Sequence, residues 1–285
     1  MIESESQLNK YLQSIQNDSL LAIDTEFRRI DSYFPELCLI QIAAGNYLEC
    51  IDVLAIKNLE PLFEKLYDSE TIWVIHSARQ DIEALYYLSQ RIPHTIFDTQ
   101  IAASLLNYPI QVSYQALTET LQNVYLEKKH TRFDWKTRPL PVDVLQYALD
   151  DVKYLLPHYE ILKDELIKSK KLQWLSEEVS FLLEKSLYEP NFKQIIKKTS
   201  GISKIDSKSQ KQAINLVIWR EDTARKENKP RKWIMSDERL IDYATGKNKL
   251  SLSSQELFEK FLNTNQIEKK LQAPLVTQQP LSADE

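Results

Sequence analysis

The chain has 285 residues, 43% of them hydrophobic and 27% charged, with a formal net charge of −5 at pH 7. Its three glycines, Gly45, Gly201 and Gly246, stand too far apart to build a phosphate-binding loop, which excludes P-loop ATPases, kinases and dinucleotide-binding dehydrogenases. No apolar run approaches the length of a membrane span, and the first residues lack the basic and apolar regions of a signal peptide. We therefore expect a protein that uses no membrane, no organic cofactor and no nucleotide fuel.

The first predicted strand, residues 20–26, begins with apolar residues and ends with two acidic ones. An apolar run from Leu20 to Ile23 is followed by Asp24 and Glu26 at alternate positions. On an extended chain these two side chains point to the same face, where carboxylates repel each other unless they are protonated or bind a cation. A strand end that enters a polar loop would explain the pair equally well, so this motif alone decides nothing.

Two further strands are predicted at residues 37–43 and 47–53, with a hairpin turn around Gly45. They carry the two cysteines of the chain, Cys38 and Cys50, which we interpret as small core residues rather than zinc ligands. So few cysteines, together with the lack of an export signal, indicate a reducing, cytoplasmic compartment.

A fourth strand at residues 71–77 is predicted to lead into a helix over residues 78–89, and a fifth strand is predicted at 95–98. Asp81 lies in the first turn of that helix, at the edge where open α/β sheets place their ligands. An aspartate near a helix start also stabilises the helix dipole, and for Asp81 alone that interpretation stays open. We interpret His76 as a hydrogen-bonded structural residue.

The segment from Val142 to Leu156 is predicted to form one amphipathic helix. Tyr147 and Asp151 are four residues apart and share one face of it. A phenol and a carboxylate placed in this way can hold a metal ion and a water molecule together. Asp150 is the rival ligand, but it is rotated away from that face, and we assign it a solvated or structural role.

With these motifs in place, the chain resembles the DEDD superfamily of 3′–5′ exonucleases, and within it the subclass whose last motif is YxxxD. The similarity to bacterial ribonuclease D extends to LCLIQIA (37–43), FDTQIAASLL (97–106) and KKHTRFDWKTRPLP (128–141). It covers roughly residues 1–190. Each motif is weak alone, whereas their combination in this order is specific.

This resemblance implies the roles of the acidic residues. Asp24, Glu26, Asp81 and Asp151 would bind two divalent ions, Mg²⁺ or Mn²⁺, which prefer carboxylate oxygens, and Asp24 would bridge them. Such ions would lie about 4 Å apart, one activating water and the other stabilising the departing 3′ oxygen. Tyr147 would orient the attacking water. The expected activity is the release of nucleoside 5′-monophosphates from an RNA 3′ end, with tRNA precursors and other structured RNAs as substrates.

Other residues are candidates for contacts with nucleic acid. Lys128 and Arg132 stand in a basic segment with interleaved aromatic residues, typical of a loop over single-stranded RNA, and we expect them to contact phosphate. Asp134 and Trp135 are expected to fix the conformation of that loop. Phe27, directly after the DTE motif, is expected either to stack on a terminal base or to lie in the core.

A change in charge marks a second region. Residues 192–235 contain 12 Lys and Arg and 4 Asp and Glu, a net charge of +8 that leaves −13 for the remainder. Such a surface attracts phosphate regardless of sequence. The segment around Arg220 and Arg231 resembles the HRDC module, a helical domain that follows the nuclease domain in ribonuclease D, and both arginines are candidate nucleic-acid contacts. Trp219 and Trp233 are expected in its core.

The expected fold is a ribonuclease-H-like α/β nuclease domain with a mixed five-stranded sheet, followed by an all-α domain. We predict an exonuclease domain at residues 1–190, an HRDC-like domain at 205–271 and a disordered tail at 272–285. The sequence has room for one HRDC module, whereas ribonuclease D often has two. A DNA exonuclease of the same chemistry and a non-catalytic RNA-binding module of the same fold are the alternatives. The module would have lost an acidic ligand, and all four are present.

Overall fold

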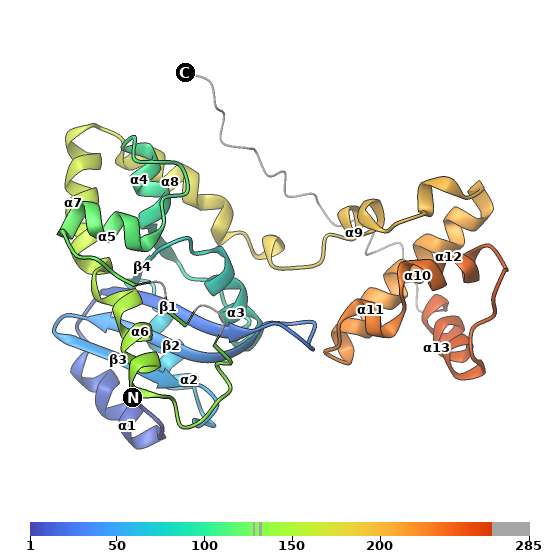
Figure 1. Ribbon diagram of the computed structural model, residues 1–285, viewed down its shortest axis with the longest axis horizontal. Coiled ribbons are helices and arrows are strands. Elements are labelled where there is room, and N and C mark those ends of the chain that lie inside the picture. Colours follow the sequence, from blue (N-terminus) through green and yellow to red (C-terminus); the bar gives the residue numbers. More distant parts are fainter. Residues whose placement is uncertain (128, 131–132, 264–285) are drawn as a thin grey trace. The chain divides into compact units, whose positions relative to one another are not determined.

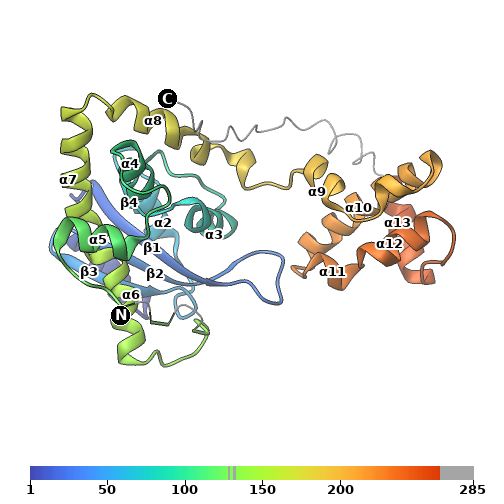
Figure 2. The same cartoon turned by 45° about the horizontal axis from the view of Figure 1, so that its top comes forward.

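The computed structural model describes residues 1–127, 129–130 and 133–263, and the chain divides into two compact units (Figures 1 and 2). The first unit contains Met1–Arg28 and Pro35–Lys185, and the second contains Arg29–Phe34 and Ser186–Glu285. The connection between the first two strands is thus counted with the second unit. The predicted tail, 272–285, and the last part of the predicted HRDC-like domain lie outside the described residues.

The first unit is built on one mixed sheet of five strands, in the order β3–β2–β1–β4–β5. The strands are β1 (Leu20–Arg28), β2 (Glu36–Ala44), β3 (Tyr47–Asp52), β4 (Ile72–Ile75) and β5 (Thr95–Asp98). β2 pairs antiparallel with β1 and with β3, whereas β4 pairs parallel with β1 and with β5. The predicted five-stranded mixed sheet is confirmed, including the short hairpin turn at Gly45, whose φ of +52° suits glycine.

Helices cover this sheet (Figure 1). They are α1 (Glu5–Ser14), α2 (Glu60–Leu66), α3 (Arg79–Ser89), α4 (Thr99–Leu105), α5 (Tyr114–Gln122), α6 (Val142–Lys153), α7 (Leu155–Lys168) and α8 (Leu172–Ser180). Helix α6 packs against β1, β2 and β3, and α3 packs against β1 and β2. A cluster that includes the free, buried cysteines Cys38 and Cys50 and the apolar face of α6 forms the core there.

The prediction of a single helix from Val142 to Leu156 is wrong, because the helix is interrupted at Tyr154, between α6 and α7. Pro157 is the reason: it has no N–H to donate to the carbonyl of Lys153, and its ring would clash with that carbonyl in a continuous helix. Tyr154 leaves the helical path with φ −103° and ψ 0°, and α7 then begins at Leu155.

The second unit is helical within the described residues. Two short 3₁₀ helices precede it: η1 (Phe181–Leu183) ends the first unit, and η2 (Lys185–Leu187) spans the boundary. The elements after them are α9 (Phe192–Lys198), η3 (Ile202–Lys204), α10 (Ser207–Lys226), α11 (Arg231–Ile234), α12 (Asp237–Ala244) and α13 (Leu252–Leu262). Its own core centres on α10, with Leu216, Trp219, Leu240 and Phe258 among the buried residues. None of the described helices is long and apolar enough to cross a membrane.

Candidate active site

The central strand β1 presents Asp24 and Glu26 side by side. Both are half-buried, while Thr25 between them is buried and points to the opposite face of the strand. Asp24 pairs with Gln41 of β2, so these two side chains share a face. The pairing with β2 shifts its register directly after Glu26. A register shift of this kind bends the strand and ends the regular alternation next to the two acids.

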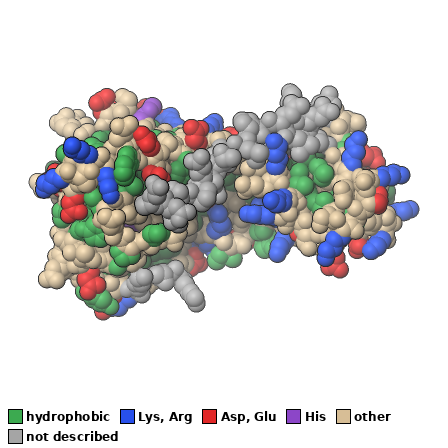
Figure 3. All heavy atoms as spheres, turned by 90° about the horizontal axis from the view of Figure 1, so that it is seen from above, with side chains coloured by type: hydrophobic (Ala, Val, Ile, Leu, Met, Phe, Trp, Pro, Cys, Tyr) green, Lys and Arg blue, Asp and Glu red, His purple; other side chains and the backbone are tan. Residues whose placement is uncertain are grey.

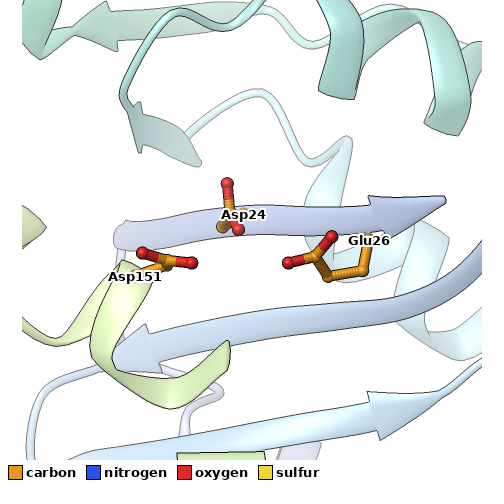
Figure 4. A group of neighbouring side chains, drawn as sticks. All are labelled: Asp24, Glu26 and Asp151. Carbon is orange, nitrogen blue, oxygen red and sulfur yellow. The ribbon is translucent and has the colours of Figure 1, made fainter. Parts of the chain in front are cut away.

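Helix α6 brings the third carboxylate to this face. Carboxylate oxygens of Asp24, Glu26 and Asp151 all lie within 4.8 Å of one another. Figure 4 shows the three side chains directed toward one another, two from β1 and one from α6. The Tyr147 hydroxyl, one helical turn before Asp151, faces the Asp151 carboxylate and acts to lower its pKa as a hydrogen-bond donor does. Two elements far apart in the sequence therefore form one anionic site with a phenol beside it.

The electrostatics of the site favour a bound cation. Burial raises the pKa of Glu26 to about 9, and the charges of Asp151 and Asp81 add to this shift. Burial also raises the pKa of Asp151 to about 7, although the hydrogen bond from Tyr147 acts in the opposite direction. The pKa of Asp24 lies well above its usual range, first through burial and then through its three acidic neighbours. These carboxyl groups ionise together only if positive charge is supplied.

Asp81 occupies a different position from the three carboxylates that meet. It lies in the first turn of α3 and is buried, and its Oδ1 accepts a hydrogen bond of 2.6 Å from the Thr25 hydroxyl. Burial raises its pKa to about 7. Its charge contributes to the raised pKa values of Asp24 and Glu26, so it belongs to the same electrostatic site. Its role as a metal ligand stays a prediction.

The turn that carries Asp81 is fixed by Asp98. The buried Asp98 carboxylate accepts hydrogen bonds from the backbone N–H groups of Ser77 (3.1 Å) and Ala78 (2.8 Å), and it also caps α4. Ser77 has a left-handed φ of +63°, which these bonds stabilise. His76 contacts Thr99 Oγ1 and Val112 O through its two ring nitrogens, which confirms the structural interpretation of this histidine.

The end of α6 is held by Tyr114 of α5. The buried Tyr114 hydroxyl donates to the carbonyl of Asp150 (2.9 Å) and accepts from the N–H of Tyr154 (3.1 Å). It thereby ties both sides of the break between α6 and α7, one residue from Asp151. The partners of Tyr114 are backbone groups 36 and 40 residues away, so no sequence pattern indicated this contact.

Aromatic rings pack around Tyr147. The Trp135 ring lies 6.5 Å from the Tyr147 ring, centroid to centroid, at an interplanar angle of 28°, and His130 approaches it edge-on at 5.8 Å. Trp135 is buried, and Asp134 accepts a hydrogen bond from the N–H of Lys136. The expectation that Asp134 and Trp135 fix their own segment is thus confirmed. Their segment also supports the ring of the site tyrosine.

The structure places the predicted nucleic-acid contacts in different environments, and two of them lie outside the described residues. Lys128 and Arg132 lie outside the described residues. Phe27 is half-buried at the residue after Glu26, and Arg231 is 43% exposed and lies 3.3 Å from Glu221. Arg220 must be corrected: it is 1% exposed, because its guanidinium donates to the Met235 carbonyl and the Asp237 carboxylate inside the second unit. It is a structural residue.

The residues present fit a divalent cation. The donor set consists of carboxylate oxygens, which Mg²⁺ and Mn²⁺ prefer. Burial, and then the repulsion between the carboxylates, raises the pKa values of Asp24 and Glu26, and a bound cation would favour their ionised forms. Beside it, the buried Gln41, opposite Asp24, has no hydrogen-bond partner for either side-chain polar atom among the described residues. A bound, hydrated ion would supply both positive charge and polar partners.

Comparisons with known proteins relate this chain to a family of nucleases. A family model described as 3′–5′ exonuclease matches residues 1–167. Ribonuclease D of Bartonella henselae is 36% identical over 247 residues, which cover 86% of this chain and 60% of the relative, and that of Sphingobium indicum is 32% identical, covering 100% and 74%. The chain thus spans less than two thirds of the length of several such relatives.

Among solved structures, Escherichia coli RNase D, described as an exoribonuclease involved in structured RNA processing, superposes with a TM-score of 0.81. The two chains are 26% identical, and the match covers 96% of this chain and 75% of that one. The sheet and the helical region that follows it therefore occur together in one known architecture. The chain belongs to the ribonuclease D family of 3′–5′ exonucleases.

Proposed function

We propose that this protein is a metal-dependent exoribonuclease that releases nucleoside 5′-monophosphates one at a time from the 3′ end of RNA. The observation that carries the proposal is the meeting of Asp24, Glu26 and Asp151 within 4.8 Å, with the Tyr147 hydroxyl on Asp151. The family membership supports it, since this combination stands in a chain related to ribonuclease D. Retention of all four acids argues against a non-catalytic module.

In the proposed mechanism, Asp24, Glu26, Asp151 and Asp81 would hold two divalent ions, Mg²⁺ or Mn²⁺. Such ions would supply Lewis acidity, for activation of a water molecule and for stabilisation of the departing oxygen. The chain's own contribution is geometric. β1 and α6 fix the carboxylates, and the hydrogen bond from Thr25 orients Asp81. Burial and the nearby carboxylates raise the pKa of Tyr147, so its hydroxyl stays protonated and orients water by hydrogen bonding rather than as a base.

The proposed partners are RNAs with a free 3′ end, with tRNA precursors and other structured RNAs as the expected class. We further propose that residues 205–271 act as an HRDC-like domain and that its basic surface contributes RNA affinity. The two cysteines are free and buried, as expected in a reducing compartment, and we place the protein in the cytoplasm.

The test is a time course on 5′-labelled RNA and DNA oligonucleotides of matched sequence, with Mg²⁺, Mn²⁺ or EDTA. We expect a ladder that shortens from the 3′ end of RNA only when metal is present. A ladder on DNA alone would make the protein a DNA exonuclease. Absence of any ladder with RNA still bound would favour the non-catalytic module.

Replacement of one ligand tests the metal assignment. We expect Asp151→Asn to reduce the cleavage rate by at least about 100-fold, since a ligand of a two-metal site is lost, while RNA binding is largely retained. Asp150→Asn is the matched control, because the Asp150 carboxylate, next to Asp151 in the sequence, accepts a hydrogen bond from Gln146 and is not one of the three carboxylates that meet on β1 and α6. Full activity of the Asp151→Asn variant in Mg²⁺ would show that the metal assignment is wrong.

A further inference from the structure

The short helix α11 places a tryptophan on the surface of the second unit. The Trp233 side chain is 66% exposed, whereas the next two residues, Ile234 and Met235, contribute to the core of this unit. The predicted core position is therefore wrong for Trp233, although it is correct for Trp219, which is 6% exposed. An indole in water forgoes the hydrophobic free energy that burial would give, so its position favours a binding role.

Hydrogen bonds hold the backbone around Trp233. Its N–H donates to the carbonyl of Pro230 at 2.8 Å. On its other side, the buried Arg220 guanidinium donates to the carbonyl of Met235 at 3.0 Å and to the carboxylate of Asp237 at 2.7 Å. Arg220 thus fixes the chain two residues beyond Trp233. A ligand meets a preorganised segment, and binding costs little ordering entropy.

The surroundings of Trp233 are strongly basic. Residues 225–233 contain five Lys and Arg and a single Glu, a net charge of +4. The side chains of Lys226, Lys229 and Arg231 are 68%, 52% and 43% exposed, and Lys232 is exposed as well. Figure 3 shows Lys and Arg side chains spread over the visible face of this unit, to the right of the view. Three of these cations lie beside an acidic residue, since Lys226, Lys229 and Arg231 approach Asp222, Glu227 and Glu221. With these three acids counted, residues 221–233 still carry a net charge of +2.

We propose that this surface, Lys229 to Trp233, binds single-stranded RNA, with one base stacked on Trp233 and phosphates neutralised by Lys229, Arg231 and Lys232. The inference rests on the proposed function and names a second contact for its substrate. An aromatic ring among cations is the combination that single-stranded nucleic acid requires. A protein partner fits less well, since the centres of protein interfaces are depleted of lysine.

The affinity of the full chain is measured by fluorescence anisotropy with 5′-labelled single-stranded RNA of about 20 nucleotides, in EDTA to prevent cleavage. We expect Trp233→Ala and Trp233→Leu to weaken binding by about 5- to 100-fold, because one base–aromatic stack is lost. Trp233→Phe should keep most of the affinity. Trp174→Ala is the matched control, because Trp174 of α8 is also exposed, at 52%, and belongs to the first unit.

The leucine and phenylalanine variants separate stacking from apolar packing. Loss of affinity with leucine and its recovery with phenylalanine support the proposal, even if the alanine variant fails to fold. Wild-type affinity of the leucine variant overturns it and leaves Trp233 as a contact for protein. Lys232→Ala should lower the slope of log Kd against log salt concentration by about 0.7, and an unchanged slope argues against the phosphate contact.

Hydrolysis of a dinucleotide in Mg²⁺ distinguishes this inference from the proposed function, because it reports on the active site with a substrate that lacks the longer RNA strand proposed to bind Trp233. We expect all Trp233 variants to hydrolyse it at the wild-type rate. If the wild-type chain hydrolyses nothing but its RNA affinity depends on Trp233, the proposed function fails and the RNA surface stands. If the wild-type chain hydrolyses the dinucleotide and the Trp233 variants bind RNA with wild-type affinity, the proposed function stands and the proposed RNA surface fails.

Discussion

The acidic residues of the site oppose the stability of the metal-free protein. Asp24, Glu26 and Asp151 face one another with their pKa values raised by burial and by mutual repulsion. Each group binds protons more readily in the folded than in the unfolded chain. The folded state is therefore favoured at low pH, and this contribution is lost as the pH rises through the folded pKa values. Function and stability conflict at these positions, as is common in active sites.

We expect the melting temperature of the metal-free protein to fall as the pH rises from about 6.5 to about 8.5, and Mg²⁺ to reduce the fall. Glu26, with its pKa raised to about 9, keeps its proton in the folded chain through most of this window, whereas in the unfolded chain it is ionised. Each proton bound only by the folded state contributes at most about 1.4 kcal/mol per pH unit. Thermal melts in EDTA and in Mg²⁺ at closely spaced pH values measure this effect.

Other groups titrate only near the edges of this window. Burial lowers the pKa of His158 to about 4, so this histidine is neutral in the folded chain, whereas in the unfolded chain it loses its proton around the lower edge, which favours folding as the pH rises there; free thiols in the unfolded chain ionise mainly near and above the upper edge. The control is Asp24→Asn, which should stabilise the metal-free protein by about 1–2 kcal/mol, or roughly 2–8 °C, and flatten the pH profile. A melting temperature in EDTA that rises across the window would contradict the expected repulsion.

At the scale of elements, the break between α6 and α7 sets the position of the metal-binding helix. Helix α6 ends because Pro157 cannot continue it, and the Tyr114 hydroxyl joins the carbonyl of Asp150 to the N–H of Tyr154 across the break. The Asp151 carboxylate is thereby placed by a contact from a helix, α5, that supplies no ligand itself. Contacts of this kind orient metal ligands and tune metal affinity.

We expect Tyr114→Phe to destabilise the protein by about 1–3 kcal/mol, since two backbone groups lose a buried partner, and to weaken Mg²⁺ affinity by about 10-fold. Cleavage should be reduced at limiting Mg²⁺ and largely recovered at saturating Mg²⁺. The measurements are Mn²⁺ binding by calorimetry and the rate as a function of Mg²⁺ concentration.

The matched control is Tyr159→Phe. Tyr159 is equally buried, but its hydroxyl contacts the Lys163 amine rather than the backbone near the site. We expect the Tyr159→Phe variant to keep the wild-type Mn²⁺ affinity and the wild-type dependence of the cleavage rate on Mg²⁺ concentration. If Tyr114→Phe lowers the melting temperature yet leaves Mn²⁺ affinity intact, Tyr114 is a packing residue and does not position Asp151.

The sequence predicted the sheet and most of the site because their signals are local. The strands are short apolar runs, the DTE motif shows its alternation within three residues, and Tyr147 and Asp151 are one helical turn apart. The helix break was missed because the apolar spacing continues past Tyr154 and outweighed Pro157. The contact of Thr25 with Asp81 joins residues 56 positions apart, and no local pattern reports such a bond.

Two residues of the second unit were predicted wrongly: Arg220 is buried and Trp233 is exposed. Arg220 was expected on the surface because it is charged, and Trp233 in the core because it is aromatic. Arg220 is buried because Asp237 and a carbonyl satisfy its guanidinium, which composition cannot reveal. Trp233 follows two cations in a helix of four residues, too short for a periodic pattern to indicate its exposed side.

For the whole molecule, charge is divided between the two units. The second unit contains 19 basic and 14 acidic residues, a net charge of +5, and the first contains 17 basic and 27 acidic residues, a net charge of −10. A net charge of −5 for the chain therefore hides a basic unit, and it is no argument against nucleic-acid binding.

We expect the affinity for long single-stranded RNA to fall steeply with salt, since phosphate contacts of the basic unit release counterions, with a slope of roughly −0.7 per contact. The KM for a dinucleotide should depend on salt much less. Anisotropy titrations and initial rates in about 50–200 mM KCl provide the comparison. Equal slopes for the two substrates would indicate that the basic unit is a solvated surface without a role in binding.

The burial of both cysteines has a practical consequence for spectroscopy. Burial raises the pKa of the Cys38 thiol to about 11 and that of Cys50 to about 12, so neither forms the thiolate that reacts with maleimides near neutral pH. The natural chain therefore serves as an unreactive background for site-specific labelling. A cysteine introduced at a site such as Ile110, which is 75% exposed, would accept a fluorophore alone, and single-molecule measurements need no prior removal of native cysteines.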